Sequence, residues 1–250
     1  MTLTTVFIDQ PLQVNPIRTR RTVDAFTRIW HFLTAFTFTV AYLTAESEAF
    51  RLMHITLGYT LGGLLFLRVL WGVWGPRPAR WSSLWAKLRG LGSWIEGMRT
   101  FNVNLPLAQN LYMSLSVVAM LLAIAPLVLS GYVTYQEWTG DWMEEVHEFF
   151  GNFMLVAVVL HIAGVVVLSL LRRRNLATPM LTGRVVGAGP DLVKSNHGWL
   201  ATLLLVAVVS FWVWQWQASP QQQGASMGAW LHPVLGQAQS KQSDDHYEDD

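Results

Sequence analysis

One apolar stretch limits the possible folds of this 250-residue chain more than any other: residues 147–166, which contain His147 and His161, fourteen positions apart. At about 100° per residue in a helix, fourteen steps return to within roughly 40° of the starting direction, so both imidazoles lie on one face. At ~1.5 Å per residue they are ~21 Å apart, one near each side of a ~30 Å hydrocarbon core. Two ligand sites are one interpretation, and hydrogen bonds to neighbouring helices are the other.

The composition is that of a multi-spanning membrane protein. Hydrophobic residues make up 52% of the chain and charged residues only 13%, about half the share that is usual in soluble domains. There is no Cys, which excludes disulfides, iron–sulfur clusters, thiolate ligands and covalent haem attachment through cysteine. A metal or haem would have to be bound by His, Met or carboxylates. We expect a lipid membrane as partner and no nucleic acid.

Five stretches are long and apolar enough to be transmembrane helices, and Pro126 is expected to kink the third. The stretches are residues 26–44, 50–74, 111–132, 145–171 and 198–216.

The segments between these stretches are more polar. Residues 1–24 lack the features of a cleaved signal peptide and are predicted to form a flexible cytoplasmic arm. Apolar residues at intervals of three and four in residues 81–99 predict an amphipathic helix at the membrane interface, or else a connector packed under the bundle. Residues 175–196 are predicted to be a second connector, and residues 218–250 a polar tail.

The distribution of basic residues predicts the orientation. With the N-terminus inside, 15 of the 17 Lys and Arg residues lie in inner segments or at inner helix ends, all except Arg51 and Lys241. Because Lys and Arg in short loops determine topology, we expect a cytoplasmic N-terminus. Five spans then place the C-terminus on the outer side.

This orientation sorts four histidines into two levels. His31 begins the first span and lies toward the inside, whereas His54 begins the second and lies toward the outside. The fourth span starts outside, so His147 is at the outer level and His161 at the inner one. The depths therefore pair His54 with His147 and His31 with His161. Two imidazoles on one haem iron leave no open coordination position, which favours electron transfer.

The segments that contain these histidines resemble the bacterial cytochrome b561 and nickel–iron hydrogenase b-type cytochrome family, which also includes membrane subunits of formate dehydrogenase and thiosulfate reductase. The resemblance covers residues 25 to about 174. It rests on Arg28-Ile-Trp-His31, His54-Ile-Thr-Leu-Gly58-Tyr, Leu67-Arg68-Val-Leu-Trp71-Gly72-Val-Trp74-Gly75, Ser130-Gly131, His147-Glu148 and His161-Ile-Ala-Gly164.

The resemblance implies a four-helix core that holds two b haems, with electrons exchanged between a quinone and a redox partner. The positions that match the family's axial ligands are His31, His54, His147 and His161. The family often has an Asn-Pro-x-Gly segment before the third span, near a cytoplasmic quinone site. This chain departs from it with Asn102-Val-Asn104-Leu-Pro106, which lacks the Gly.

Other residues have two interpretations each. Arg68, fourteen residues after His54, could pair with a haem propionate or snorkel to the interface, and so could Arg28. His197 is interpreted as an interfacial histidine, and Met residues as gap fillers. Close approach of helices or of a macrocycle is expected at Gly58, Gly62 and Gly63, and no redox role is expected for His232 and His246.

The sequence thus predicts an all-α membrane protein: a four-helix haem-binding transmembrane bundle at residues 25–174, plus a fifth transmembrane helix at 197–217. The predicted function is the cytochrome b subunit of a respiratory complex in the bacterial inner membrane, with a quinone and a periplasmic redox protein as partners. That protein would be a c-type cytochrome or a hydrogenase or dehydrogenase subunit. The alternatives are a stand-alone superoxide:quinone oxidoreductase and a haem-free membrane anchor.

The outer face is expected to be acidic. Residues 240–250 are charged mainly by Asp and Glu and are predicted to be disordered. They are interpreted either as a solubilising tail or as part of a docking site for a partner with a basic face. In the second interpretation they act together with the acidic loop that contains Glu137, Asp141, Glu144 and Glu145.

Overall fold

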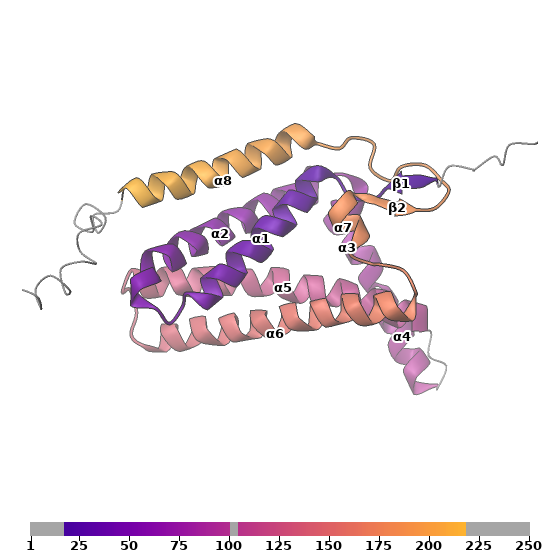
Figure 1. Cartoon of the computed structure of the whole chain (residues 1–250). Coiled ribbons are helices and arrows are strands. Elements are labelled where there is room, and N and C mark those ends of the chain that lie inside the picture. Colours follow the sequence, from indigo (N-terminus) through magenta and orange to yellow (C-terminus); the bar gives the residue numbers. More distant parts are fainter. Residues whose placement is uncertain (1–17, 101–104, 219–250) are drawn as a thin grey trace, which may run out of the picture.

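The computed structural model describes residues 18–100 and 105–218, and five long helices dominate it (Figure 1). The long helices are α1 (Ala25–Leu43), α2 (Arg51–Trp74), α5 (Leu105–Tyr135), α6 (Trp142–Leu171) and α8 (Gly198–Ala218). Shorter elements are the 3-10 turns η1 (Glu48–Phe50) and η2 (Arg77–Ala79), the helices α3 (Trp81–Leu88), α4 (Gly90–Arg99) and α7 (Thr178–Thr182), and the strands β1 (Thr19–Arg21) and β2 (Arg184–Val186).

The helices α1, α2, α5 and α6 form a four-helix core, and α8 packs on its outside. The pairs α5–α6 and α1–α2 have the most extensive contacts, α2 joins the two pairs through α5, and α8 lies along α1. The Trp212 indole of α8 donates a hydrogen bond of 2.9 Å to Thr60 Oγ1 of α2. The prediction of an all-α membrane bundle with an added helix is therefore confirmed.

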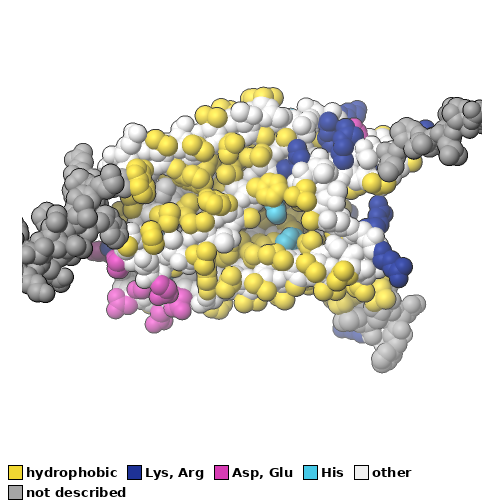
Figure 2. Space-filling model, in the orientation of Figure 1, with side chains coloured by type: hydrophobic (Ala, Val, Ile, Leu, Met, Phe, Trp, Pro, Cys, Tyr) yellow, Lys and Arg dark blue, Asp and Glu magenta, His cyan; other side chains and the backbone are white. Residues whose placement is uncertain are grey.

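Among the described residues, four helical segments are long and apolar enough to cross a membrane: Glu48–Trp74, Leu105–Tyr135, Trp142–Leu171 and Gly198–Ala218. Most of their surface consists of apolar side chains that face outward, as Figure 2 shows for one side of the molecule. The first predicted span, α1, is not among the four. Its 19 residues include Arg28, His31 and four Thr, which lower its hydropathy.

Local chemistry explains where several helices begin and end. The Asp24 carboxylate caps α1 by accepting hydrogen bonds from Thr27 N and Thr27 Oγ1, at 3.3 and 2.6 Å. Helix α2 ends at Gly75 because Pro76 follows it. Pro126 lies inside α5, which continues as a helix on both sides of it. The predicted kink there stays a prediction.

A two-stranded sheet joins the start of the described chain to the segment before α8. The strands β1 and β2 are antiparallel, with Thr19 opposite Val186 and Arg21 opposite Arg184. Arg21 N also donates a 2.6 Å hydrogen bond to the Asp191 carboxylate. The prediction of a flexible arm is therefore wrong for residues 18–24. The partner strand is too distant in sequence for a local pattern to indicate it, and residues 1–17 lie outside the described residues.

The predicted interfacial helix consists of two helices, α3 and α4, which meet at Arg89. The side chain of Trp81, at the start of α3, packs so closely against Gly72 of α2 that a Cβ on Gly72 would lie 2.1 Å from the Trp81 Nε1 atom. The Trp81 indole also donates a hydrogen bond to Val69 O. Only a glycine at position 72 lets α3 dock on α2 in this way.

Two hydrophobic clusters of buried residues occur within residues 18–100 and 105–218. The first lies toward the end of the bundle where α1 begins, and includes Phe26, Trp30, Leu64 and Leu204. The second lies toward the opposite end, and includes Phe38, Leu61, Ile124 and Met154.

Candidate haem-ligand pairs

The structure brings His54 and His147 together. His54 is in the first turn of α2, and His147 is near the start of α6. Their ring centroids are 6.0 Å apart and the rings are inclined at 79° to each other. We call His54 and His147 the outer pair.

Both imidazoles of the outer pair have their Nδ1 atom held by a neighbouring helix. His54 Nδ1 lies 2.8 Å from Ala41 O of α1, and His147 Nδ1 lies 2.9 Å from Leu127 O of α5. Because a carbonyl oxygen can only accept, Nδ1 carries the proton in both rings, and Nε2 keeps its lone pair. A histidine that ligates a metal through Nε2 typically has this arrangement.

Ser130 and Gly131 of α5 both lie against the imidazole of His147. The Ser130 hydroxyl donates to Leu127 O at 3.1 Å and lies 3.3 Å from His147 Nδ1, so it can accept a share of the same N–H. A Cβ on Gly131 would lie 2.7 Å from His147 Cε1, closer than real side chains approach. The absence of a side chain at position 131 therefore makes room for the imidazole.

We call the remaining two candidates, His31 of α1 and His161 of α6, the inner pair. His161 Nδ1 lies 3.2 Å from Ser116 Oγ of α5, and that hydroxyl donates to Met113 O at 3.0 Å. The hydroxyl oxygen is thus available to accept the Nδ1–H of His161. His31 Nδ1 is buried and has no hydrogen-bond partner among the described residues.

This donor set fits two haem irons better than free metal ions. No group of three or more His, Asp or Glu that could hold an ion occurs within residues 18–100 and 105–218, whereas a porphyrin supplies four nitrogens and needs only two axial ligands. With metal–imidazole bonds of ~2.0 Å, two rings on opposite sides of one ion have centroids roughly 6 Å apart. The separation in the outer pair agrees with this value.

There is also room for a flat cofactor between the helices that carry these histidines. Helix α6 makes few direct contacts with α1 or α2. A Cβ on Gly58 or on Gly63 of α2 would meet nothing within 4 Å, whereas one on Gly62 would meet Val128. Gly62 thus serves helix packing, and Gly58 and Gly63 border open space. Figure 2 shows histidine side chains in a hollow between hydrophobic ones.

Arg68 of α2 is a partly buried cation with an incomplete set of partners. Its guanidinium carbon lies 5.8 Å from the ring centroid of Trp30 and 5.0 Å from that of Trp81. One of its nitrogens, Nη1, is buried without a hydrogen-bond partner in the part of the chain that the structure describes. A carboxylate of a bound cofactor would satisfy it.

Arg28 and His197 have protein partners, although Arg28 Nε and His197 Nδ1 are also buried without a hydrogen-bond partner among the described residues. Arg28 Nη1 donates a 2.9 Å hydrogen bond to Leu181 O at the end of α7, which supports a structural role in holding that turn. His197 lies edge-on to Trp71, and its Nδ1 is 3.8 Å from the Asp24 carboxylate. His232 and His246 lie outside the described residues, as does most of the segment around Asn102.

The sequence analysis missed Ser116 and the backbone acceptors of the histidines. A serine inside an apolar span is a sequence signal that could have indicated Ser116, because such hydroxyls often bond to a neighbouring helix. The carbonyls of Ala41 and Leu127 could not have been found, since every residue has one.

An apolar helical bundle in which two levels of paired histidines are presented from three helices defines a membrane cytochrome b. Comparison with protein families agrees: the model of the prokaryotic cytochrome b561 family matches residues 22–183, more than half of the chain. The chain belongs to this family, as the sequence predicted. It is a multi-pass membrane b-type cytochrome that binds haem b and acts in electron transfer. No curated protein and no solved structure matches the chain significantly.

Proposed function

We propose that this cytochrome carries electrons across the bacterial inner membrane through two haems, between a quinone and a redox protein on the periplasmic side. The observation that supports it most is that the rings of His54 and His147 lie 6.0 Å apart, with Nδ1 of His54, His147 and His161 held by other helices. When bound, a haem supplies a one-electron carrier.

The residues of this chain have separate parts in the proposal. Nε2 of each histidine would hold a haem iron, and two histidines for each iron would favour electron transfer over chemistry on oxygen or a substrate. The tethered Nδ1 atoms would fix ring orientation and raise ligand basicity. Arg68 would neutralise a carboxylate of the cofactor at the inner level.

The distribution of charge supports the proposed orientation. Figure 2 shows basic side chains gathered at one end of the bundle and acidic ones at the other. The acidic end includes the exposed residues Glu137, Asp141, Glu144, Glu145 and Glu148, next to the outer pair. Because basic loops stay in the cytoplasm, we place the N-terminus and the inner pair on the cytoplasmic side. Because the family includes subunits of respiratory complexes, we propose that this chain is also a subunit of such a complex.

The acidic end would then be the docking face for the periplasmic partner. Trp138 is 67% exposed there and contacts Tyr132 with ring centroids 5.4 Å apart. Tyr132 follows Gly131, which contacts His147. A partner with a basic face would thus be attracted to an acidic surface beside the outer pair, where the rings of Trp138 and Tyr132 are in contact.

Haem content of single histidine variants tests the proposal. Replacing His54 or His147 with Ala should remove one and the same b-type spectral component, and replacing His31 or His161 the other, because each iron needs both imidazoles. Redox titration with optical detection separates the components. Substituting His197, which is in neither pair, is the matched control. The pairing is wrong when His54 and His161 variants lose the same component while His54 and His147 variants do not.

A further inference from the structure

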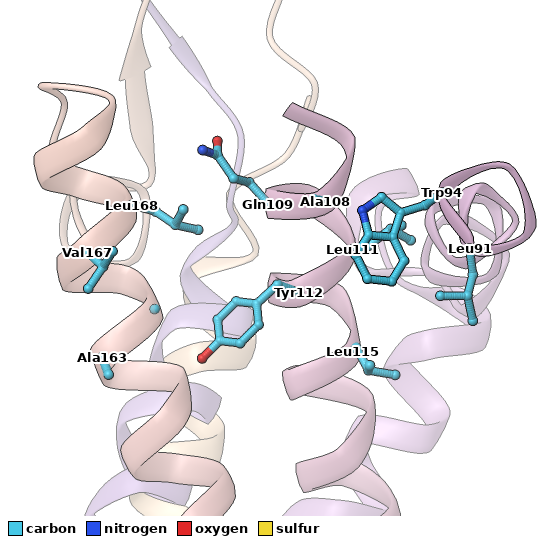
Figure 3. Close-up of a pocket in the computed structure, with 11 residues that line it drawn as sticks. Leu91, Trp94, Ala108, Gln109, Leu111, Tyr112, Leu115, Ala163, Val167 and Leu168 are labelled. Carbon is cyan, nitrogen blue, oxygen red and sulfur yellow. The ribbon is translucent and has the colours of Figure 1, made fainter. Parts of the chain in front are cut away.

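An apolar groove lies at the inner end of the bundle, between α4, α5 and α6 (Figure 3). Its volume is about 520 Å³, which is in the range of small-molecule sites. Leu91 and Trp94 of α4 line one side, and Ala163 and Val167 of α6 line the other. The groove belongs to none of the histidine pairs and has no role in the proposed electron path.

The groove is shaped by a glycine. A Cβ on Gly164 would lie 2.2 Å from the Tyr112 ring, so the bare backbone at this position lets Tyr112 fold against α6. The Tyr112 hydroxyl is tied to Leu160 O. Because its hydroxyl is engaged in this way, Tyr112 adds its ring to a lining that is mostly apolar.

One end of the groove is polar and basic. Gln109 lies at the upper end in Figure 3. Its Oε1 accepts a 2.7 Å hydrogen bond from Arg172 Nε, and Arg172 Nη2 lies 3.3 Å from Asn110 Oδ1. Arg172 and Arg173 are both exposed where α6 ends, as is Arg99 at the end of α4. The acidic residue of α4, Glu96, is two positions from Trp94, about 200° around the helix from the groove side.

We propose that this groove is a binding site for an anionic phospholipid, with an acyl chain between α4 and α6 and the phosphate at Arg172 and Arg173. An apolar channel that ends at Gln109, which is bonded to the Arg172 guanidinium, matches both parts of such a lipid, and the exposed Arg173 follows directly in the sequence. A neutral quinone would fill the channel but would not need the arginines. Bound there, the lipid would fasten the interfacial helix α4 to the bundle. The inference does not rest on the histidine pairs.

Native mass spectrometry can test this with protein released from nanodiscs that contain equal amounts of phosphatidylglycerol and phosphatidylcholine. The unaltered protein should retain phosphatidylglycerol in preference. Arg172→Gln with Arg173→Gln should reduce that preference by about five-fold for each arginine removed. The matched control, Arg77→Gln with Lys87→Gln, removes two exposed charges from the same end away from α6 and should leave the preference unchanged.

A second pair of variants tests the acyl-chain part. Ala163→Phe fills the groove and should abolish retention of both lipids, whereas Val166→Phe, at a 51% exposed position that does not line the groove, should not. Haem absorbance and melting temperature report whether each variant folds. If the double arginine variant fails to fold, Arg173→Gln alone serves, because the hydrogen bonds to Gln109 and Asn110 come from Arg172.

Three results would overturn the proposal. One is equal retention of the two lipids by the unaltered protein. Another is an equal loss of preference in the Arg77 and Lys87 control. The third is a quinone retained in place of a lipid and lost in Ala163→Phe, which would assign the groove to the quinone. Absence of haem would defeat the proposed function but leave the lipid measurement intact, so the two failures are distinguishable.

Discussion

The outer and inner histidine pairs are built from the same residue type but are held differently. Both outer imidazoles donate to backbone carbonyls, at 2.8 and 2.9 Å. At the inner level His161 donates to the hydroxyl of Ser116, and His31 Nδ1 is buried without a partner among the described residues. A carbonyl is fixed by the helix that contains it, whereas a hydroxyl can rotate. The outer pair is therefore the more rigidly oriented of the two.

The surrounding charges differ as well. The outer pair lies near the acidic end of the bundle, whereas the inner level includes the partly buried cation Arg68. Strong Nδ1–H donation and nearby carboxylates favour ferric iron, and a nearby cation favours ferrous iron. We therefore expect the lower midpoint potential at the outer pair. Under the proposed function, electrons would then flow downhill from the periplasmic partner toward the quinone.

The largest effect is expected from filling the space beside the outer pair. Gly131→Val would push on His147, which already lies 2.7 Å from the position of a Cβ at residue 131. The outer spectral component should be lost while the inner one remains. Gly151→Ala is the control, because a Cβ there meets Leu127 at an ordinary 3.9 Å. For each variant, the haem content per protein and the reduced-minus-oxidised spectrum show which component remains. Loss of both components together would show general misfolding instead.

The second largest effect is expected from removing the cation near the inner pair. Arg68→Gln should lower the inner midpoint potential by on the order of 60 mV, which is a tenfold change in a one-electron equilibrium. The outer potential should stay within error, and Arg77→Gln, which removes an exposed charge, should change neither. Potentiometric titration measures the shift. An inner potential that does not move would mean that Arg68 only stacks on its two tryptophans.

The two serines allow the comparison between the pairs to be sharpened. Ser116 is the hydroxyl partner of His161, while Ser130 shares His147 with Leu127 O. Ser116→Ala should therefore broaden the inner component and shift its potential more than Ser130→Ala shifts the outer one. Low-temperature electron paramagnetic resonance of the oxidised protein reports imidazole orientation directly. Equal shifts in the two variants would argue against the distinction between carbonyl and hydroxyl acceptors.

Deleting the tail is expected to have no effect on the haems. Deleting residues 240–250, which lie outside the described residues, should slow association with a basic c-type cytochrome at low salt and leave both potentials unchanged. The rate difference should shrink as the Debye length falls below ~10 Å above 0.1 M salt. Stopped-flow kinetics across a salt series measure it, and an unchanged rate with the same salt slope would make the tail merely solubilising.

Much of this arrangement could be predicted from the sequence because membrane helices have strong local signals. The five predicted spans coincide with the five long helices, and the predicted depths of His54 and His147 agree with their contact in the structure. What could not be predicted depends on contacts between distant residues. The Trp81 side chain comes from α3 yet stacks on Arg68 of α2, and the acceptors of His54 and His147 are backbone atoms without a sequence signature. Tertiary packing decides such contacts.

The antiparallel pairing of β1 with β2 has a consequence for how often the chain crosses the membrane. Two strands in one sheet lie on one side, so the number of crossings between Arg21 and Arg184 must be even. The segment between them contains three candidate spans, α2, α5 and α6, which is odd. Parity therefore requires α1 to cross as well, despite its arginine, histidine and threonines. The single later crossing by α8 then puts Thr19 and Ala218 on opposite sides.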